Sequence, residues 1–170
     1  MTIPINPMAI DIFLQPGDVY FGDRDTRIRT VLGSCVSITF WHAGLKLGGM
    51  CHYMLPGRSG KANGQRDGRY ADEALGLLFD EMRTAGTQPR DYQAKIFGGG
   101  RMFSTAAEPG TLDVGSRNIE VGRRLLRGHG LEPASEHLAG TGHRNIIFEV
   151  ASGAVWVRHA PERANLRDVI

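Results

Sequence analysis

The stretch at residues 45–55, LKLGGMCHYML, carries apolar residues at both odd and even positions. Successive side chains of a β-strand point to opposite faces of the sheet, so a strand with this pattern is covered on both sides. The stretch before it, residues 27–40, is rich in apolar and β-branched residues and is broken by Gly33-Ser34. It predicts two strand segments joined at a sharp turn. The chain therefore needs a sheet with a layer of structure on each face.

Helical periodicity follows at two places. Residues 69–86 place their apolar side chains on one helical face, with Gly86 at the position of a C-terminal cap. Residues 116–130 repeat the pattern, with Ser116 as the expected N-cap. Further strands are expected at residues 92–97, 131–139, 145–152 and 154–160, the last two as a hairpin turned at Ser152-Gly153. The helices interrupt the strand order without alternating with it, which predicts an α+β domain with a mixed sheet and helices packed on one side.

Length and composition narrow the class of protein. The 170 residues fit one domain, residues 1–170, with a loose tail over 160–170. The net charge of +2 does not require a nucleic-acid partner. The N-terminus lacks a secretory signal, and no stretch approaches the roughly 20 apolar residues of a membrane-spanning helix. With two cysteines, interpreted as reduced thiols, the chain is expected to be cytoplasmic and not inserted into a membrane.

Two conventional site patterns fit poorly. The glycines of FGGGR, Gly98, Gly99 and Gly100, resemble a phosphate-binding loop, but such a loop closes on Lys and Ser or Thr, and here Arg101 and Met102 follow. The ordinary interpretation is a close backbone approach, in a segment that lines a cleft. A zinc site built from Cys35, Cys51, His52 and His42 lacks the short paired spacing of structural zinc.

Cys35 and His52 form a third candidate. A catalytic cysteine attacks as its thiolate and needs a feature that lowers its pKa, such as an imidazole or backbone N–H groups. The LGSC turn would lift Cys35 off the sheet edge, with Gly33 adopting angles that other residues resist. Two residues buried in neighbouring strands explain the same pattern, and the residue types alone leave both interpretations open.

Six motifs along the chain match one bacterial family: TVLGSCVSITFW, GGMCHYMLPG, GRYADEAL, KIFGGGRMF, VGSRNIEVGRRLL and GTGHRNIIFEVASGAVWVR. They keep their order and spacing over residues 15–159, which we take as the core of the domain. Through them the chain resembles the CheD family, the chemoreceptor glutamine deamidases of bacterial chemotaxis. The resemblance implies a layered α/β/β fold, related to deamidating bacterial toxins, and a cysteine hydrolase mechanism.

The resemblance also implies the site residues. It makes Cys35 the nucleophile and His52 the base, with backbone N–H groups near Gly33 and Ser34 as the oxyanion site. The family's third residue is a threonine six positions before the cysteine, where this chain has Arg29. Neighbouring strand residues face opposite ways, so Thr30 is expected to replace it only if the turn shifts the register by one. Arg29 would otherwise bind substrate.

The function implied is hydrolysis of glutamine side chains on methyl-accepting chemotaxis receptors, with no metal or cofactor. The groove for a helical receptor is expected at residues 59–68 and at Gly98, Gly99 and Gly100. A CheC-type chemotaxis phosphatase is a further expected partner. The alternative is a binding module that docks on receptors or phosphatase without turnover, which the departure at Arg29 favours. A general cysteine protease is disfavoured because the sequence offers no acidic or amide partner for His52.

Overall fold

The computed structural model describes residues 6–58, 60, 64–102 and 113–161. The helices are α1 (Ala71–Thr84), the short 3-10 helix η1 (Pro89–Asp91) and α2 (Val114–Gly128). The strands are β1 (Ile10–Phe13), β2 (Val19–Gly22), β3 (Thr26–Leu32), β4 (Val36–His42), β5 (Leu47–Cys51), β6 (Gln93–Gly98), β7 (Ser135–Leu138), β8 (His143–Glu149) and β9 (Val155–Ala160).

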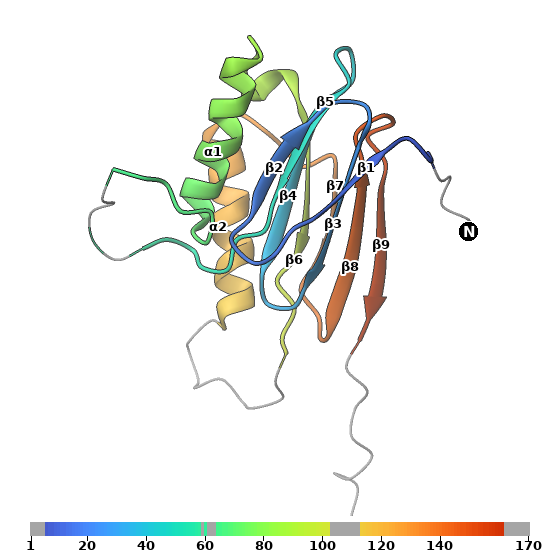
Figure 1. The fold of residues 1–170 in the computed structure, drawn as a ribbon. Coiled ribbons are helices and arrows are strands. Elements are labelled where there is room, and N and C mark those ends of the chain that lie inside the picture. The colour runs from blue at the N-terminus through green and yellow to red at the C-terminus, as the bar shows by residue number, and fades with distance from the viewer. Residues whose placement is uncertain (1–5, 59, 61–63, 103–112, 162–170) are drawn as a thin grey trace, which may run out of the picture.

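The strands form two stacked sheets. The central sheet has the order β2-β5-β4-β6-β7, and the outer sheet has the order β1-β3-β8-β9. Both helices pack on one face of the central sheet, and the outer sheet covers its other face (Figure 1). Each sheet contains both parallel and antiparallel pairs. The α+β prediction and the α/β/β layering implied by the resemblance are therefore confirmed, although the strands divide between two sheets.

Two apolar cores explain why the central strands are apolar on both faces. The core under the helices contains Val36, Ile38 and Phe40 of β4, together with Cys51 and Tyr53. The core between the sheets consists of Leu14, Ile28, Leu32, Met50, Phe97, Ile146, Phe148 and Val150. Alternate residues of one strand therefore enter different cores.

Several local predictions are confirmed. The strands flanking Gly33-Ser34, both long helices and the hairpin turned at Gly153 are present, with a φ of +75° at that glycine. The N-cap of α2 was predicted wrongly. Asp113 is the cap, and its carboxylate accepts a hydrogen bond from Ser116 N at 2.8 Å. An aspartate three residues before a backbone N–H satisfies that donor at the start of the helix, whereas Ser116 lies inside the first turn.

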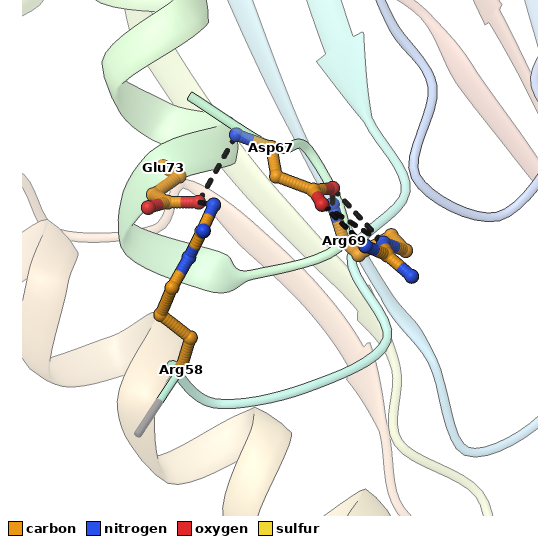
Figure 2. A network of polar contacts seen from close by, with 4 residues as sticks. All are labelled: Arg58, Asp67, Arg69 and Glu73. Carbon is orange, nitrogen blue, oxygen red and sulfur yellow. Dashed lines mark hydrogen bonds and ion pairs between the residues drawn. The ribbon is translucent and has the colours of Figure 1, made fainter. Parts of the chain in front are cut away.

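The glycine-rich loop that follows β5 is fastened to the first turn of α1 (Figure 2). Arg58 donates to Glu73 Oε2 at 2.7 Å, and the backbone N–H of Asp67 donates to the same oxygen at 3.0 Å. Arg69 in turn pairs with the Asp67 carboxylate at 2.6 Å. The hydrogen bond from Arg58 lowers the pKa of Glu73, so the carboxylate stays ionised. Residues 59 and 61–63 of this predicted groove wall lie outside the described residues.

The remaining expectations concern the ends of the chain. Ala160 ends β9, and the predicted loose tail lies outside the described residues from residue 162 onward. Within the described ranges, no helix combines the length and the apolar character needed to cross a membrane.

Candidate active site

The turn between β3 and β4 carries the chain from the outer sheet into the central sheet, and Cys35 is its last residue. The Cys35 side chain is half-buried and packs against the inter-sheet core. Its neighbour Val36 points the other way, into the core under the helices. The thiol therefore lies at an end of the core between the sheets, where it is partly exposed to solvent.

His52 lies on the same face as Cys35. Val36 and Tyr53 form an antiparallel hydrogen-bonded pair, with N–H to carbonyl distances of 3.1 and 3.0 Å. In this register Met54 lies opposite Cys35, and His52 is its diagonal neighbour on the inter-sheet face. Diagonal neighbours in antiparallel strands are about 7 to 8 Å apart, within reach of an aromatic side chain. The fold thus brings together two residues that are separated by a complete strand.

Thr30 of β3 lies beneath the imidazole. Its Oγ1 is 2.7 Å from His52 Nδ1, and it also donates to the carbonyl of Leu14 at 2.8 Å. A hydroxyl has one proton, which the Leu14 carbonyl receives, so Thr30 must accept from the imidazole. His52 therefore carries its proton on Nδ1 and presents the lone pair of Nε2. That Nε2 is buried and has no hydrogen-bond partner among the described residues.

This arrangement corrects the expectation about the third residue. Thr30 is 1% exposed and faces His52, without any need for a bulge in β3. Arg29 faces outward, where it pairs with Asp11 at 3.1 Å and lies over the Phe13 ring. The register shift expected to be necessary is therefore not needed for Thr30 to face His52, and the part of Thr30 in the reaction stays a prediction. Because neighbouring strand residues face opposite ways, only one of Arg29 and Thr30 can face His52. The packing of β3 on the central sheet directs Thr30 inward.

The site is uncharged at rest. Burial lowers the pKa of His52 to about 4, against the opposing charge of Asp18. Burial also raises the pKa of the Cys35 thiol, and its hydrogen bond with the residue's own backbone only partly compensates. The expectation of a lowered thiol pKa is thus wrong for the resting site. Near pH 7 the pair consists of a neutral thiol and a neutral imidazole, which is the form that can accept a proton.

The segment after β1 fixes the backbone of His52. Gly17 N donates to the His52 carbonyl at 2.8 Å, and His52 N donates to the Asp18 carbonyl at 3.1 Å. Leu14, in the same segment, receives the Thr30 hydroxyl. No motif in the sequence predicted this contribution, because the segment has no strand pattern and its contacts all lie far away along the chain. The only available signal was its Pro-Gly-Asp turn at residues 16–18.

The three glycines predicted to line a groove support the turn that carries Cys35. Gly99 N donates to the Cys35 carbonyl and Gly100 N to the Gly33 carbonyl, both at 2.9 Å. A Cβ on Gly98 would lie 2.3 Å from the Cys35 carbonyl oxygen, so the close approach inferred from the sequence is confirmed. All three are buried, and their contact with a substrate stays a prediction.

Gly33 has a different role from the one expected. The positive φ angles lie at Gly98 (+111°) and Gly99 (+68°), whereas Gly33 has none. A Cβ on Gly33 would instead lie 2.8 Å from the sulfur of Met102. A side chain at Gly33 would therefore have to displace the flexible end of Met102, and the expectation of an unusual backbone angle is wrong. Ser34 is half-buried between it and Cys35. Within the described part of the chain, neither Ser34 N nor Cys35 N donates to another residue, and the Cys35 amide interacts with the thiol of its own residue.

The four residues considered for zinc do not form one cluster, because the side chains of Cys51 and His42 lie apart from those of Cys35 and His52. Cys51 is fully buried in the core under the helices, where burial raises the pKa of its thiol to about 12. His42 ends β4, and its Nδ1 accepts from Leu45 N at 3.0 Å. In the ranges that the structure describes, no three His, Cys, Asp or Glu side chains group as metal ligands. Both cysteines are free thiols.

Comparison with known proteins places the chain among bacterial chemotaxis proteins. A family model described as CheD chemotactic sensory transduction matches residues 54–159. A probable chemoreceptor glutamine deamidase CheD of Pseudomonas savastanoi pv. phaseolicola is 48% identical over 169 residues, which cover 99% of this chain and 94% of the relative. The chain belongs to the CheD family. The family assignment made from the six motifs is therefore confirmed.

Other CheD relatives extend across distant bacteria. The probable chemoreceptor glutamine deamidase CheD of Pseudomonas fluorescens is 49% identical over 152 residues, covering 89% of this chain and 85% of the relative. A Leptospira interrogans protein with the name probable chemoreceptor glutamine deamidase CheD 1 is 42% identical over 157 residues, covering 88% and 92%. The family model begins after Thr30, Cys35 and His52, whereas the match to the Pseudomonas savastanoi CheD spans nearly the whole chain.

Proposed function

We propose that this protein is a chemoreceptor glutamine deamidase that hydrolyses glutamine side chains of methyl-accepting chemotaxis receptors to glutamate and ammonia. One observation carries the proposal: the Thr30 hydroxyl accepts from His52 Nδ1, so that Nε2 is left as an unpaired base on the face that holds Cys35. Membership of the CheD family and the names of its relatives support the choice of substrate.

The first half of the reaction forms a thioester. His52 Nε2 takes the proton of the Cys35 thiol while the sulfur attacks the side-chain carbonyl carbon of the substrate glutamine. Because both groups are neutral at rest, proton transfer accompanies the attack. The imidazolium that results stays hydrogen-bonded to Thr30 through Nδ1. It then gives its Nε2 proton to the departing nitrogen, and ammonia leaves as the carbon–nitrogen bond breaks.

The second half returns the enzyme to its starting state. His52 Nε2 takes a proton from water as the water oxygen attacks the thioester carbon. The carbon–sulfur bond breaks, the thiolate regains the proton from His52, and the product is a glutamate side chain. During both attacks the carbonyl oxygen becomes negative, and we assign its stabilisation to backbone N–H groups of the Gly33-Ser34-Cys35 turn, where Ser34 N donates to no other described residue. No metal or cofactor takes part.

The alternative of a binding module without turnover was favoured by Arg29 in place of the family's threonine. The contact between the Thr30 hydroxyl and His52 weakens that argument, because we propose that Thr30 takes the place of the missing threonine. Arg29 is left as an exposed outer-sheet residue, free to contact a partner.

We further propose that the protein works in the cytoplasm and also binds a CheC-type phosphatase where the organism has one. Two free thiols are the form expected in a reducing compartment. A competition experiment tests whether the phosphatase binds the same site as the receptor. If it does, receptor fragments should displace the bound phosphatase. Simultaneous binding of both would contradict a shared site.

To test the function, the purified protein is incubated with receptor cytoplasmic fragments. Peptide mass spectrometry then measures the conversion of glutamine to glutamate. The proposal expects conversion at specific glutamines, with one ammonia released for each, and its loss in His52→Ala. A wild-type protein that binds the fragment and converts nothing would establish the binding module. Undiminished conversion by His52→Ala would remove the assigned base.

A further inference from the structure

The side-chain amide of Asn118, on α2, joins the two segments that carry Cys35 and His52. Its Nδ2 donates to the Ser34 carbonyl at 3.1 Å and to the Met54 carbonyl at 2.8 Å. The residue is completely buried. Ser34 directly precedes Cys35, and Met54 is two residues after His52. One nitrogen from the helical layer therefore spans the two neighbouring segments of the central sheet at the end where the site lies.

The orientation of this amide is fixed by chemistry. Carbonyl oxygens only accept, so the nitrogen must face them, and both of its protons are used. Asn118 Oδ1 is left buried without a hydrogen-bond partner among the described residues. A buried carbonyl without a partner costs stability, and the side chain is therefore poorly suited to simple filling of space. An apolar residue of similar size would fill the same space but would lack the two N–H donors of Asn118 Nδ2.

Two further contacts attach α2 to the segments around the site. The Tyr53 hydroxyl donates to the backbone carbonyl of Asn118 at 2.6 Å. One turn earlier, α2 packs directly on the glycine segment: a Cβ on Gly115 would lie 2.6 Å from the Gly99 carbonyl oxygen. Gly99 in turn binds the Cys35 carbonyl. The helix is thus attached to the turn by backbone contact on one side and by the Asn118 amide on the other.

We propose that Asn118 is a positioning residue that sets the separation and angle between the Cys35 thiol and His52 Nε2. The inference rests on the proposed function, because it takes these two groups as the reacting pair. Cys35 lies at the free end of a turn, where Val36 makes the last hydrogen-bonded pair with Tyr53. Without the amide, the backbone restraints left on the turn among the described residues are the glycine segment and the Val36–Tyr53 pair. A displacement of 1 Å in a reacting group can lower the rate about 10²-fold.

The test uses Asn118→Ala, and Asn118→Ser as a variant that keeps one donor on a shorter side chain. Tyr53→Phe is the matched control, because it removes the hydrogen bond to the backbone of Asn118 and leaves the side-chain amide in place. Two quantities are measured for each folded variant. The first is kcat and KM for a receptor glutamine. The second is the rate of Cys35 alkylation by iodoacetamide from pH 5 to 9, with Cys51 separated by peptide mass spectrometry.

In the wild type, a neutral His52 assists alkylation, so the rate is flat across neutral pH; in His52→Ala it should rise steadily with pH as the thiol ionises. The proposal expects both Asn118 variants to follow the His52→Ala profile, with kcat lowered about 10²-fold and KM unchanged. Tyr53→Phe should unfold more easily and keep the flat profile.

Several outcomes would decide the matter. A wild-type profile and kcat in either Asn118 variant would overturn the proposal. A wild-type profile without the flat region would overturn it too, because His52 would then not assist Cys35. Loss of the flat region in the Asn118 variants of a protein that shows no deamidation would support positioning and contradict only the proposed function.

Discussion

At the scale of single residues, the role of His52 as a base depends on which group donates the hydrogen atom between Thr30 and His52. The hydroxyl proton goes to Leu14, and so the imidazole must supply the other. A neutral threonine cannot stabilise an imidazolium as a carboxylate does, and its effect is to select the tautomer and fix the ring. This suits a histidine whose pKa is low and which is neutral before each attack.

Thr30→Val should lower kcat on the order of 10²-fold, because valine keeps the shape and removes the acceptor for Nδ1. Thr30→Ser keeps the hydroxyl and should stay close to wild type. Arg29→Thr is the matched change at the neighbouring position and should leave kcat unaltered. Steady-state deamidation of a receptor fragment checks all three. A large gain in kcat from Arg29→Thr would show that the third position has been assigned to the wrong residue.

The low pKa of His52 also makes stability depend on pH. Between about pH 4 and pH 6.5 the unfolded chain binds a proton on this imidazole that the folded chain does not. The contribution of the neutral ring to the free energy of unfolding is therefore complete above pH 6.5. As the pH falls toward 4, the free energy of unfolding decreases by about 3 kcal/mol.

Urea unfolding of the wild type and of His52→Asn, at pH 7 and pH 4, measures this difference. Burial lowers the pKa of His137 in the same direction, and comparison of the two proteins removes its contribution. Equal acid sensitivity of the two proteins would contradict the buried neutral ring.

At the scale of elements, α2 begins at its N-cap, Asp113, and contacts the site through Asn118 one turn further on. Asp113→Ala should lower the free energy of unfolding by about 1 kcal/mol, because the first turn loses its side-chain acceptor. Ser116→Ala, at the N-cap expected from the sequence, should change it by less than about 0.5 kcal/mol. Urea denaturation of the pair decides between the two caps. A larger loss for the serine would contradict the structure.

The glycine segment after β6 should be sensitive for steric reasons. A Cβ on Gly98 would collide with the Cys35 carbonyl, and its φ of +111° adds strain. Gly86 has a φ of +76°, and a Cβ added there would meet no atom within 4 Å, which makes Gly86→Ala a control for strain alone. Gly98→Ala should lower both stability and kcat, and Gly86→Ala only stability. Thermal unfolding and deamidation assays separate the two effects, and a fully active Gly98→Ala would argue against the role of this segment.

At the scale of the whole molecule, sequence patterns predicted what local periodicity determines. The strands around Gly33-Ser34, the apolar face of α1 and the terminal hairpin follow from neighbours in the chain. β1 and β2 were not predicted, because β1 is an edge strand with exposed Ile10 and Phe13 and pairs in parallel with β3. The inward direction of Thr30 depends on packing between two sheets, which alternation within one strand does not determine.

Asn118 was missed for a similar reason. Its partners lie 84 and 64 residues away, and no helical pattern predicts such contacts. A signal was present, since an asparagine stands beside Ile119 on the predicted inward face of the helix. A polar residue on a buried face calls for a partner, and the choice of partner required the fold.

The proposed mechanism requires that Cys35, on the inter-sheet face with His52 and Thr30, is the reacting thiol. Cys51, on the opposite face of the same sheet, supplies the matched comparison. The decisive measurement is the rate of glutamine-to-glutamate conversion in a receptor fragment by wild type, Cys35→Ala and Cys51→Ala. The account predicts that Cys35→Ala is inactive and that folded Cys51→Ala keeps a rate within a few-fold of wild type. Conversion that survives Cys35→Ala, or that depends on Cys51 alone, would contradict it.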